Sequence, residues 1–330
     1  MKKAASILAA ILLLLSLASC SSPRKDEKLS ARGIYFDTII QIDVWGAKTS
    51  TLDECKRICE HYEQLFSNKI ETSEISRINA SAGTAAEVSS ETLELISLAL
   101  HYCELSGGKF DITIAPLSDL WNFTDNEEHV VPDAAAIEEA RSHVDYRKVL
   151  VDENASTVTL QDPGAKIDLG GIAKGYIADQ LKAYLESEGV EHALINLGGN
   201  VLTLGTALDG SPFRIGIQKP FDEQNAYIDI VEAEDCSVVS SGVYQRYFEK
   251  DGSLYHHILN PETGYPYEGS LLQATVISRS SADGDALSTC CFALGLEEGS
   301  ALVESLEDVQ AVFVTEDYRL HYVGYENPDK

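Results

Sequence analysis

The chain has 330 residues, 44% of them hydrophobic, and its 53 acidic residues against 25 basic ones give a formal net charge of -28. The negative charge is spread along the chain, so it disfavours nucleic acid and anionic lipid headgroups as partners. No spacing among the 7 cysteines resembles a zinc site.

The N-terminal residues have the pattern of an export signal. Two lysines precede an apolar run, residues 4–17, that is too short for a typical membrane-spanning helix. Small residues stand directly before Cys20, as in a bacterial lipoprotein box, so we expect cleavage there and lipidation of Cys20; a plain signal peptide with an incidental cysteine is the alternative. We therefore expect a signal peptide over 1–20, a flexible tether over 21–33, and a mature protein anchored by lipid on the extracytoplasmic face of the cell membrane.

In the first half of the mature chain, hydrophobic periodicity predicts a strand, several helices and a hairpin. Alternating apolar residues over 35–45 predict a half-buried strand, and residues 72–79 are polar and loop-like. The run 149–160 predicts a hairpin. Helical spacing of apolar residues predicts helices over 51–66 (capped by Thr or Ser), 90–106 (ended by two glycines) and 134–142.

The second half predicts hairpin-like strands with helices inserted. Residues 166–179 are expected to form a strand, a Gly-Gly turn and the start of a helix that ends at Gly189. Two further helices are expected over 285–295 and 297–305. The further predicted strands are 192–197, 213–217, 237–243, 273–278, 309–315 and 319–323. This order favours an α+β fold with mixed, largely antiparallel sheets and packed helices over a doubly wound sheet.

The glycine turn inside 166–179 carries candidate binding residues. Asp168 stands at the expected strand end, and neither Gly170 nor Gly171 has a Cβ, so the backbone can approach a ligand closely. Backbone N–H groups at such a turn and at a helix start bind phosphate, and Lys174 adds a cation nearby. A second strand-to-glycine turn follows at 197–200. Taken alone, one such loop is a weak signal, because most Gly-Gly turns are ordinary turns.

Two further segments contain groups suited to phosphoryl chemistry. Asp285 and Thr289 are four residues apart, so on a helix they share a face and can offer a carboxylate and a hydroxyl to Mg²⁺. The alternative is an Asp near a helix start and a Thr bonded to its own backbone. His257 has a side chain whose ordinary pKa of about 6.5 suits proton transfer, although a lone histidine beside a turn is often structural. In an extended segment His256 faces the other way.

The segment 106–121 offers an aromatic ring and a carboxylate. Phe110 is suited to stacking on a planar ring, and Asp111 to bonding a ring or ribose edge. Core packing is the alternative for Phe110.

Together these segments resemble the ApbE family of FAD:protein FMN transferases, from about residue 34 to about residue 324. The matching pieces occur in order along the chain: Phe36-Asp-Thr38, Ser73–Asn79, Gly108-Lys-Phe-Asp-Ile-Thr113, Asp168-Leu-Gly-Gly-Ile-Ala-Lys-Gly175, Asn196–Asn200, His257-Ile-Leu-Asn-Pro261 and Asp285-Ala-Leu-Ser-Thr289. The resemblance implies one catalytic domain over 34–326.

The resemblance implies an enzyme that binds FAD with Mg²⁺, cuts its pyrophosphate, passes FMN to a Ser or Thr hydroxyl of an exported flavoprotein and releases AMP. By position, the Gly171 carbonyl, Asp285 and Thr289 would hold the metal, and His257 would be the base. The residues that would touch FAD are Phe36, Lys69, Lys109, Phe110, Asp111, Asp168, Lys174, His257 and Ile258.

Two other functions use the same residues. With water as nucleophile, the site would make the protein an extracytoplasmic FAD pyrophosphatase that yields FMN and AMP. Without turnover, the protein would be a non-catalytic FAD-binding lipoprotein.

Overall fold

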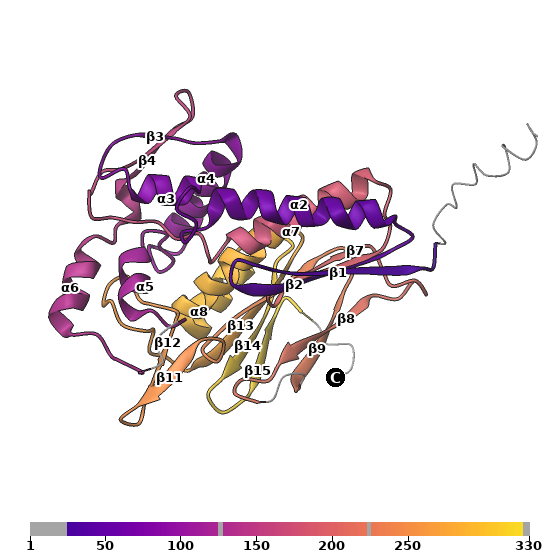
Figure 1. The fold of residues 1–330 in the computed structure, drawn as a ribbon. Helices are drawn as coiled ribbons and strands as arrows, with labels where there is room; N and C mark the ends of the chain where they lie inside the picture. Colours follow the sequence, from indigo (N-terminus) through magenta and orange to yellow (C-terminus); the bar gives the residue numbers. More distant parts are fainter. Residues whose placement is uncertain (1–24, 125–127, 223–225, 326–330) are drawn as a thin grey trace, which may run out of the picture.

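The computed structural model describes residues 25–124, 128–222 and 226–325 (Figure 1). Its helices are α2 (Thr49–Phe66), α3 (Glu74–Asn79), α4 (Ser90–Leu105), α5 (Ala115–Trp121), α6 (Ala134–Ser142), α7 (Ala173–Ser187) and α8 (Ser281–Glu304), with a 3-10 turn at Tyr146–Lys148. Its strands are β1 (Lys28–Tyr35), β2 (Thr38–Trp45), β3 (Ala86–Glu87), β4 (Val149–Asp152), β5 (Thr157–Leu160), β6 (Ala193–Leu197), β7 (Asn200–Leu204), β8 (Phe213–Gln218), β9 (Tyr227–Ala233), β10 (Ser237–Gly242), β11 (Tyr247–Lys250), β12 (Ser253–His256), β13 (Leu271–Ser278), β14 (Gln310–Thr315) and β15 (Leu320–Val323). The expected signal peptide and Cys20 lie outside the described residues.

The largest sheet in the described ranges has eight strands in the order β1-β2-β6-β7-β10-β13-β14-β15. Every neighbouring pair in this sheet is antiparallel. The α+β class with largely antiparallel sheets is therefore confirmed.

Each face of the main sheet is covered by different elements (Figure 1). Helices α2, α7 and α8 pack on one face and form the larger core with the sheet. The β8–β9 hairpin packs on the other face, where Ile217 and Val231 meet Val238, Ile277 and Val312 of the sheet. Because both faces of β13 are covered, seven of its eight residues are buried, as in a central strand.

A small lobe on the left of Figure 1 holds α3 to α6, the three-stranded sheet β3-β5-β4 and the β11–β12 hairpin. Buried residues of α3, α4, β4 and β5 belong to the larger core. A separate, smaller core joins Trp121 of α5 and Ile137 of α6 to Phe248 of β11. The indole N–H of Trp121 donates a hydrogen bond to the Gly264 carbonyl at 2.8 Å. This contact connects α5 to the turn that follows His257.

The predicted helices are confirmed where apolar spacing is regular. Helix α6 has the predicted bounds, and α4 ends one residue early. Helix α2 buries the expected stripe, but its N-cap is Lys48, which makes no side-chain cap, so the expected Thr or Ser cap is wrong. The two helices expected over 285–295 and 297–305 lie within α8, and the non-helical backbone of Gly295 divides them at the predicted place. The first begins earlier than expected, at Ser281.

The tether expected over 21–33 is wrong at its C-terminal end, because β1 begins at Lys28 and pairs with β2. Only Ala31 of its eight residues is buried. An edge strand with so little burial has nearly the composition of a flexible linker. The strand expected over 35–45 accordingly begins at Thr38, after a tight turn.

Most of the polar segment 72–79, which the sequence predicts to be a loop, is helix α3. The Ser73 hydroxyl accepts the Ser76 N–H at 3.0 Å as an N-cap, and Ile75 and Ile78 are buried. The strand expected before the glycine turn is also wrong. There the backbone makes a bridge between Ile114 and Lys166 and a bond from the Asp168 N–H to the Ile112 carbonyl. The N–H and carbonyl of Ile167 bond instead to the side chain of Asn79, at 2.7 and 2.9 Å.

Of the helices in the described ranges, α8 is the one long and apolar enough to cross a membrane. Its contacts with α7, β10 and β13 identify it as a core helix of the main domain.

Candidate active site

The turns that carry the candidate residues meet at one end of the main sheet. The β1–β2 turn holds Phe36, and the β6–β7 turn holds Gly198. The Gly198 N–H donates to the Ile39 carbonyl at 3.1 Å, so the two turns are adjacent. Strand β10 runs toward the same end and finishes at Gly242.

The glycine turn and α8 meet at Asp285. This carboxylate is 4% exposed, and its Oδ2 accepts the Gly175 N–H at 3.0 Å. The Lys174 ammonium lies 3.5 Å from the same oxygen and donates to the Gly170 carbonyl at 2.7 Å. Lys174 therefore bridges the glycine turn and the distal carboxylate, which the family resemblance predicted to lie together.

A second carboxylate fixes α7 against the start of α8. Asp179 of α7 accepts the Ser281 N–H at 2.8 Å and the Ala282 N–H at 2.9 Å, so it satisfies free N–H groups at the α8 N-terminus. Burial raises the pKa of Asp179, an effect that these two N–H donors oppose. This contact places Asp285, one turn further along α8, against the glycine turn.

The close approach of α7 and α8 requires a glycine at 175. A Cβ on Gly175 would lie 2.1 Å from the Ser281 carbonyl oxygen and 2.7 Å from the Ala282 Cα, both backbone atoms. We expect Gly175→Ala to lower the free energy of unfolding by about 3 kcal/mol, because the two helix backbones must separate. Urea denaturation measures this loss.

Gly269 supplies the matched control, because, apart from Gly269 and its two chain neighbours, the described residues place no heavy atom within 4 Å of the position that a Cβ on Gly269 would take. Gly269→Ala should leave the urea midpoint nearly unchanged. Equal midpoints for the two alanine variants would show that the helices tolerate the extra methyl group.

Thr289 lies in the same site, one turn of α8 beyond Asp285. Its hydroxyl is 3.0 Å from the Ser241 hydroxyl at the end of β10, and Ser241 is also 2.7 Å from Ser288 Oγ. The predicted shared face of Asp285 and Thr289 is therefore present. Ser241 is a neighbour that the sequence did not identify as a site residue.

The donor set fits a hard divalent cation. Asp285 and Thr289 offer a carboxylate and a hydroxyl oxygen, and the glycine turn offers the Gly171 carbonyl, which are the ligands that Mg²⁺ prefers. A cationic group already lies between a carbonyl of this turn and Asp285, namely the Lys174 ammonium. No group of three or more His, Cys, Asp or Glu side chains suited to a metal occurs in the described ranges, and the expected set contains a single carboxylate.

Asp168 is held beside the glycine turn by two donors. Its Oδ1 accepts the Gly170 N–H at 2.7 Å, and its Oδ2 accepts from the Asn68 side chain at 3.1 Å. Burial raises the pKa of Asp168, while the Gly170 N–H and the Lys174 charge oppose the shift. Asn68 connects this carboxylate to the neighbouring Lys69.

The β1–β2 turn that presents Phe36 is strained. Phe36 and Asp37 both have left-handed backbones, with φ of 51° and 55°, a conformation that non-glycine residues adopt at a cost. Glu63 of α2 holds the turn by accepting the Phe36 N–H at 2.7 Å, and Lys69 pairs with Asp37 at 2.7 Å. Strain retained by side-chain contacts marks this turn as a functional candidate.

Phe110 packs on the glycine turn. A Cβ on Gly171 would lie 2.8 Å from Phe110 Cε2. Because glycine has no Cβ, there is room for the Phe110 ring at this position. Asp111 is held within its own loop, because its oxygens accept the Thr113 N–H at 2.7 Å and the Tyr146 N–H at 3.0 Å. Burial raises the pKa of Asp111, and the Thr113 donors oppose the shift. Its predicted contact with FAD stays a prediction.

Lys109 joins this loop to the segment after His257. Its ammonium lies 3.3 Å from Glu262, and its carbonyl accepts the Tyr267 hydroxyl at 2.9 Å. Ile258 is buried in the main core, and its carbonyl accepts the Tyr267 N–H at 3.0 Å. The structure thus brings Lys109 and Ile258 to one place, while their contacts with FAD remain predictions.

The two adjacent histidines differ in environment. His256 is buried, its Nε2 lies 2.9 Å from the Tyr267 carbonyl, and its ring meets Phe292 edge-on. His257 Nδ1 is buried without a hydrogen-bond partner among the described residues. Burial, with a smaller contribution from the positive charge of Arg246, lowers the pKa of His257 to about 3. His257 is therefore neutral near pH 7, the state that a proton acceptor requires.

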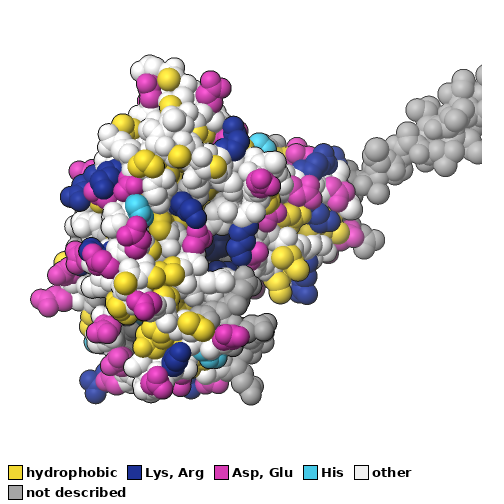
Figure 2. Space-filling model, turned by 60° about the vertical axis from the view of Figure 1, so that its left-hand side comes forward, with side chains coloured by type: hydrophobic (Ala, Val, Ile, Leu, Met, Phe, Trp, Pro, Cys, Tyr) yellow, Lys and Arg dark blue, Asp and Glu magenta, His cyan; other side chains and the backbone are white. Residues whose placement is uncertain are grey.

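The molecular surface shows a hollow on this side of the protein. The face that carries the small lobe comes forward in Figure 2, and it is hollowed near its centre with Lys or Arg side chains at the margin. Basic side chains at a hollow favour anionic ligands on a protein that is otherwise strongly acidic.

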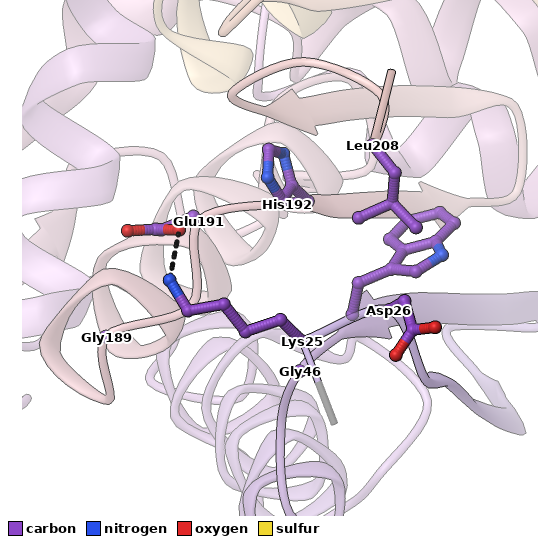
Figure 3. Close-up of a pocket in the computed structure, with 8 residues that line it drawn as sticks. Lys25, Asp26, Gly46, Gly189, Glu191, His192 and Leu208 are labelled. Carbon is purple, nitrogen blue, oxygen red and sulfur yellow. Dashed lines mark ion pairs between the residues drawn. The ribbon is translucent and has the colours of Figure 1, made fainter. Parts of the chain in front are cut away.

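A separate cavity of about 380 Å³ lies at the opposite end of β2, beside Trp45. Figure 3 shows Lys25 reaching Glu191, an ion pair of 3.7 Å, with His192 and Leu208 in the surrounding wall. None of the predicted site residues that the structure describes lines this cavity, so it is distinct from the candidate active site.

Comparison with known proteins gives consistent matches over most of the chain. Residues 36–313 match the model of the ApbE family. The FAD:protein FMN transferase of Klebsiella pneumoniae (strain 342) is 42% identical over 262 residues, which cover 79% of this chain and 81% of that protein. The enzyme of the same name from Treponema pallidum (strain Nichols) is 32% identical over 329 residues, covering 94% and 91%.

Solved structures show the same fold. The crystal structure of the ApbE protein from Thermotoga maritima has a TM-score of 0.82 and 32% identity, and the match covers 90% of this chain and 97% of that one. The flavin transferase ApbE from Vibrio cholerae has a TM-score of 0.82 and 28% identity, with the same coverage.

Proposed function

This chain belongs to the ApbE family and is an FAD:protein FMN transferase, and we propose that it uses Mg²⁺ to transfer FMN to a Ser or Thr hydroxyl of an exported flavoprotein. The observation that carries the proposal is the Lys174 bridge between the Gly170 carbonyl and Asp285. It supports a common cation site for the glycine turn and α8. The neutral His257 supports a proton acceptor in the same site.

The transfer is a nucleophilic substitution at phosphorus. The acceptor hydroxyl oxygen forms a bond to the phosphorus of the FMN half, and the bond from that phosphorus to the bridging oxygen breaks. The bridging oxygen leaves with the electron pair as part of AMP, and the hydroxyl proton passes to the His257 imidazole.

The metal would neutralise charge on the phosphoryl oxygens as a Lewis acid. The Gly171 carbonyl, Asp285 and Thr289 would hold it, and Lys174 would contribute a second positive charge beside the pyrophosphate. Phe110 offers an aromatic ring next to the glycine turn, where it would contact the flavin.

Incubation of the mature chain with FAD, Mg²⁺ and a candidate exported flavoprotein tests the function. We expect mass spectrometry to find one added FMN on an acceptor Ser or Thr, and no addition when that residue is Ala. Rapid AMP release without any acceptor would favour the FAD pyrophosphatase. Tight FAD binding without turnover under any metal would favour the non-catalytic FAD-binding protein.

We also propose that Cys20 is lipidated and anchors the protein outside the cytoplasm. The support is the N-terminal sequence, with its basic residues, short apolar run and small residues before the cysteine. Cys20→Ala should reduce the amount of protein in the membrane fraction. The protein should appear instead in the soluble fraction or as uncleaved precursor. An unchanged membrane fraction would exclude this anchor.

The environment of His257 predicts an unusual pH dependence. We expect kcat/KM for FAD to stay level as the pH falls through about 6.5, where an ordinary histidine is protonated, because burial holds the His257 pKa at about 3. In the FAD complex the negative phosphates favour the protonated imidazole and so raise the pKa of His257. The acidic limb of kcat, which reports this complex, should therefore lie at higher pH than the limb of kcat/KM, which reports the free enzyme. Steady-state profiles measure both limbs.

The same shift has a consequence for stability. Between about pH 6.5 and pH 3 the unfolded chain takes up a proton at His257 that the folded protein does not, so stability is lost as the pH falls through this window. An NMR titration of His257 in the free enzyme centred near its ordinary value would contradict both statements.

A further inference from the structure

We propose that Arg246 binds the pyrophosphate of FAD beside His257, an inference that rests on the function proposed above. Arg246 directly precedes β11 and has no part in the sequence motifs of the site. Four observations on its position and charge support the assignment.

Strand register places Arg246 opposite His257. In the β11–β12 hairpin Tyr247 pairs with His256, so the next pair outward is Arg246 with His257. The His257 N–H donates to the Arg246 carbonyl at 3.1 Å, which continues the pairing by one residue. Directly opposite residues of an antiparallel pair point to the same face, with Cβ atoms about 5 Å apart.

The aromatic pair Phe248 and Tyr255 shows which face this is. These two residues are paired two positions further along the hairpin, so they share the face of Arg246 and His257. Phe248 is buried in the small-lobe core, and Tyr255 lies against the Trp121 ring at 5.6 Å. The middle of the shared face is therefore packed against α5, while the Arg246 side chain, at the end of the strand, is exposed.

The charge of Arg246 acts on two residues of the active site. It favours the neutral form of His257 and the ionised form of Asp168. Lys174 acts on the same two groups in the same directions. The guanidinium is therefore within electrostatic range of the glycine turn as well as of His257.

The positive charge of the Arg246 guanidinium is available to a ligand. Among the residues that the structure describes, no carboxylate forms an ion pair with Arg246, although the chain has 53 acidic residues. An arginine without such a pair, beside a neutral imidazole and a glycine turn, is suited to bidentate binding of phosphate oxygens. The Lys174 ammonium, by contrast, is already bonded to protein oxygens.

The test measures ligand binding by the mature chain with FAD, ADP and riboflavin as probes. FAD and ADP contain the pyrophosphate, and riboflavin lacks it. We expect Arg246→Gln to weaken the binding of FAD and ADP about 10- to 100-fold and to leave the affinity for riboflavin unchanged. Arg246→Lys should recover part of the loss, since it restores the charge without the planar fork.

Lys250→Gln is the matched control, because Lys250 is an exposed cation at the far end of the same strand. It should bind all three probes as the parent chain does. Parent-like FAD and ADP binding by Arg246→Gln would overturn the inference and leave the proposed function standing. An equal loss of affinity for riboflavin would assign Arg246 a structural role instead. A parent chain that binds no FAD would overturn the inference and the proposed function together.

Discussion

Asp285→Ala is expected to lower the Mg²⁺-dependent rate of FMN transfer by about 10³-fold or more, equivalent to about 4 kcal/mol of transition-state stabilisation. Asp285 supplies the one charged ligand of the proposed metal set. It also faces the Lys174 ammonium and accepts the Gly175 N–H. Single-turnover rates at increasing Mg²⁺ measure the loss, and calorimetry of Mg²⁺ binding shows whether the metal is still held.

A structural defect is separated from metal loss by two further variants. Asp285→Asn keeps an oxygen for the Gly175 N–H and removes the charge, so it should fold normally and still lose the metal-dependent rate. Asp283→Asn removes a half-buried carboxylate two residues away on the same helix and should keep the rate. Wild-type turnover by Asp285→Ala would show that the metal assignment is wrong.

The sequence predicted the elements whose periodic burial is strong. Helix α2 has the buried stripe that the sequence predicted, whereas α6 buries only Ile137 and begins after a clear N-cap at Asp133. The face shared by Asp285 and Thr289 follows from helical geometry alone. The contact of that face with the glycine turn rested on the family resemblance, because it depends on the packing of α7 on α8.

The elements that the sequence missed are short or only slightly buried. Strand β1 buries one residue, and strands β11 and β12 have four residues each. Such strands are stabilised by pairing and by contacts with distant residues, which leave little local pattern. The tight turn at Phe36 was missed for a related reason, since Phe-Asp is not a sequence that favours a left-handed turn.

Arg246 and Ser241 show the same limit within the site. Arg246 becomes a site residue only through the register of β11 with β12, and Ser241 only through its contact with Thr289 on another element. The Ser-Gly pair at the end of β10 resembles the other strand-to-glycine turns and was the available signal for Ser241. Arg246 gave no comparable signal, because it is a lone arginine before a short polar strand.

His257→Gln is expected to lower kcat for FMN transfer by about 10²- to 10⁴-fold, the range typical of a lost general base. The affinity for FAD should change much less, because the neutral imidazole contributes no charge to phosphate binding near pH 7. Single-turnover rates with saturating FAD, measured beside FAD dissociation constants, separate these two quantities.

The adjacent histidine provides the comparison that decides between a catalytic and a structural role. His256 makes buried contacts with the Tyr267 carbonyl and Phe292, so His256→Gln should lower the free energy of unfolding by about 1 to 3 kcal/mol. His257→Gln leaves no buried bond broken, because His257 Nδ1 has no partner among the described residues. It should therefore keep its stability while it loses kcat. Equal losses of kcat and FAD affinity in His257→Gln would make His257 a binding residue, and the proton of the acceptor hydroxyl would then need another base.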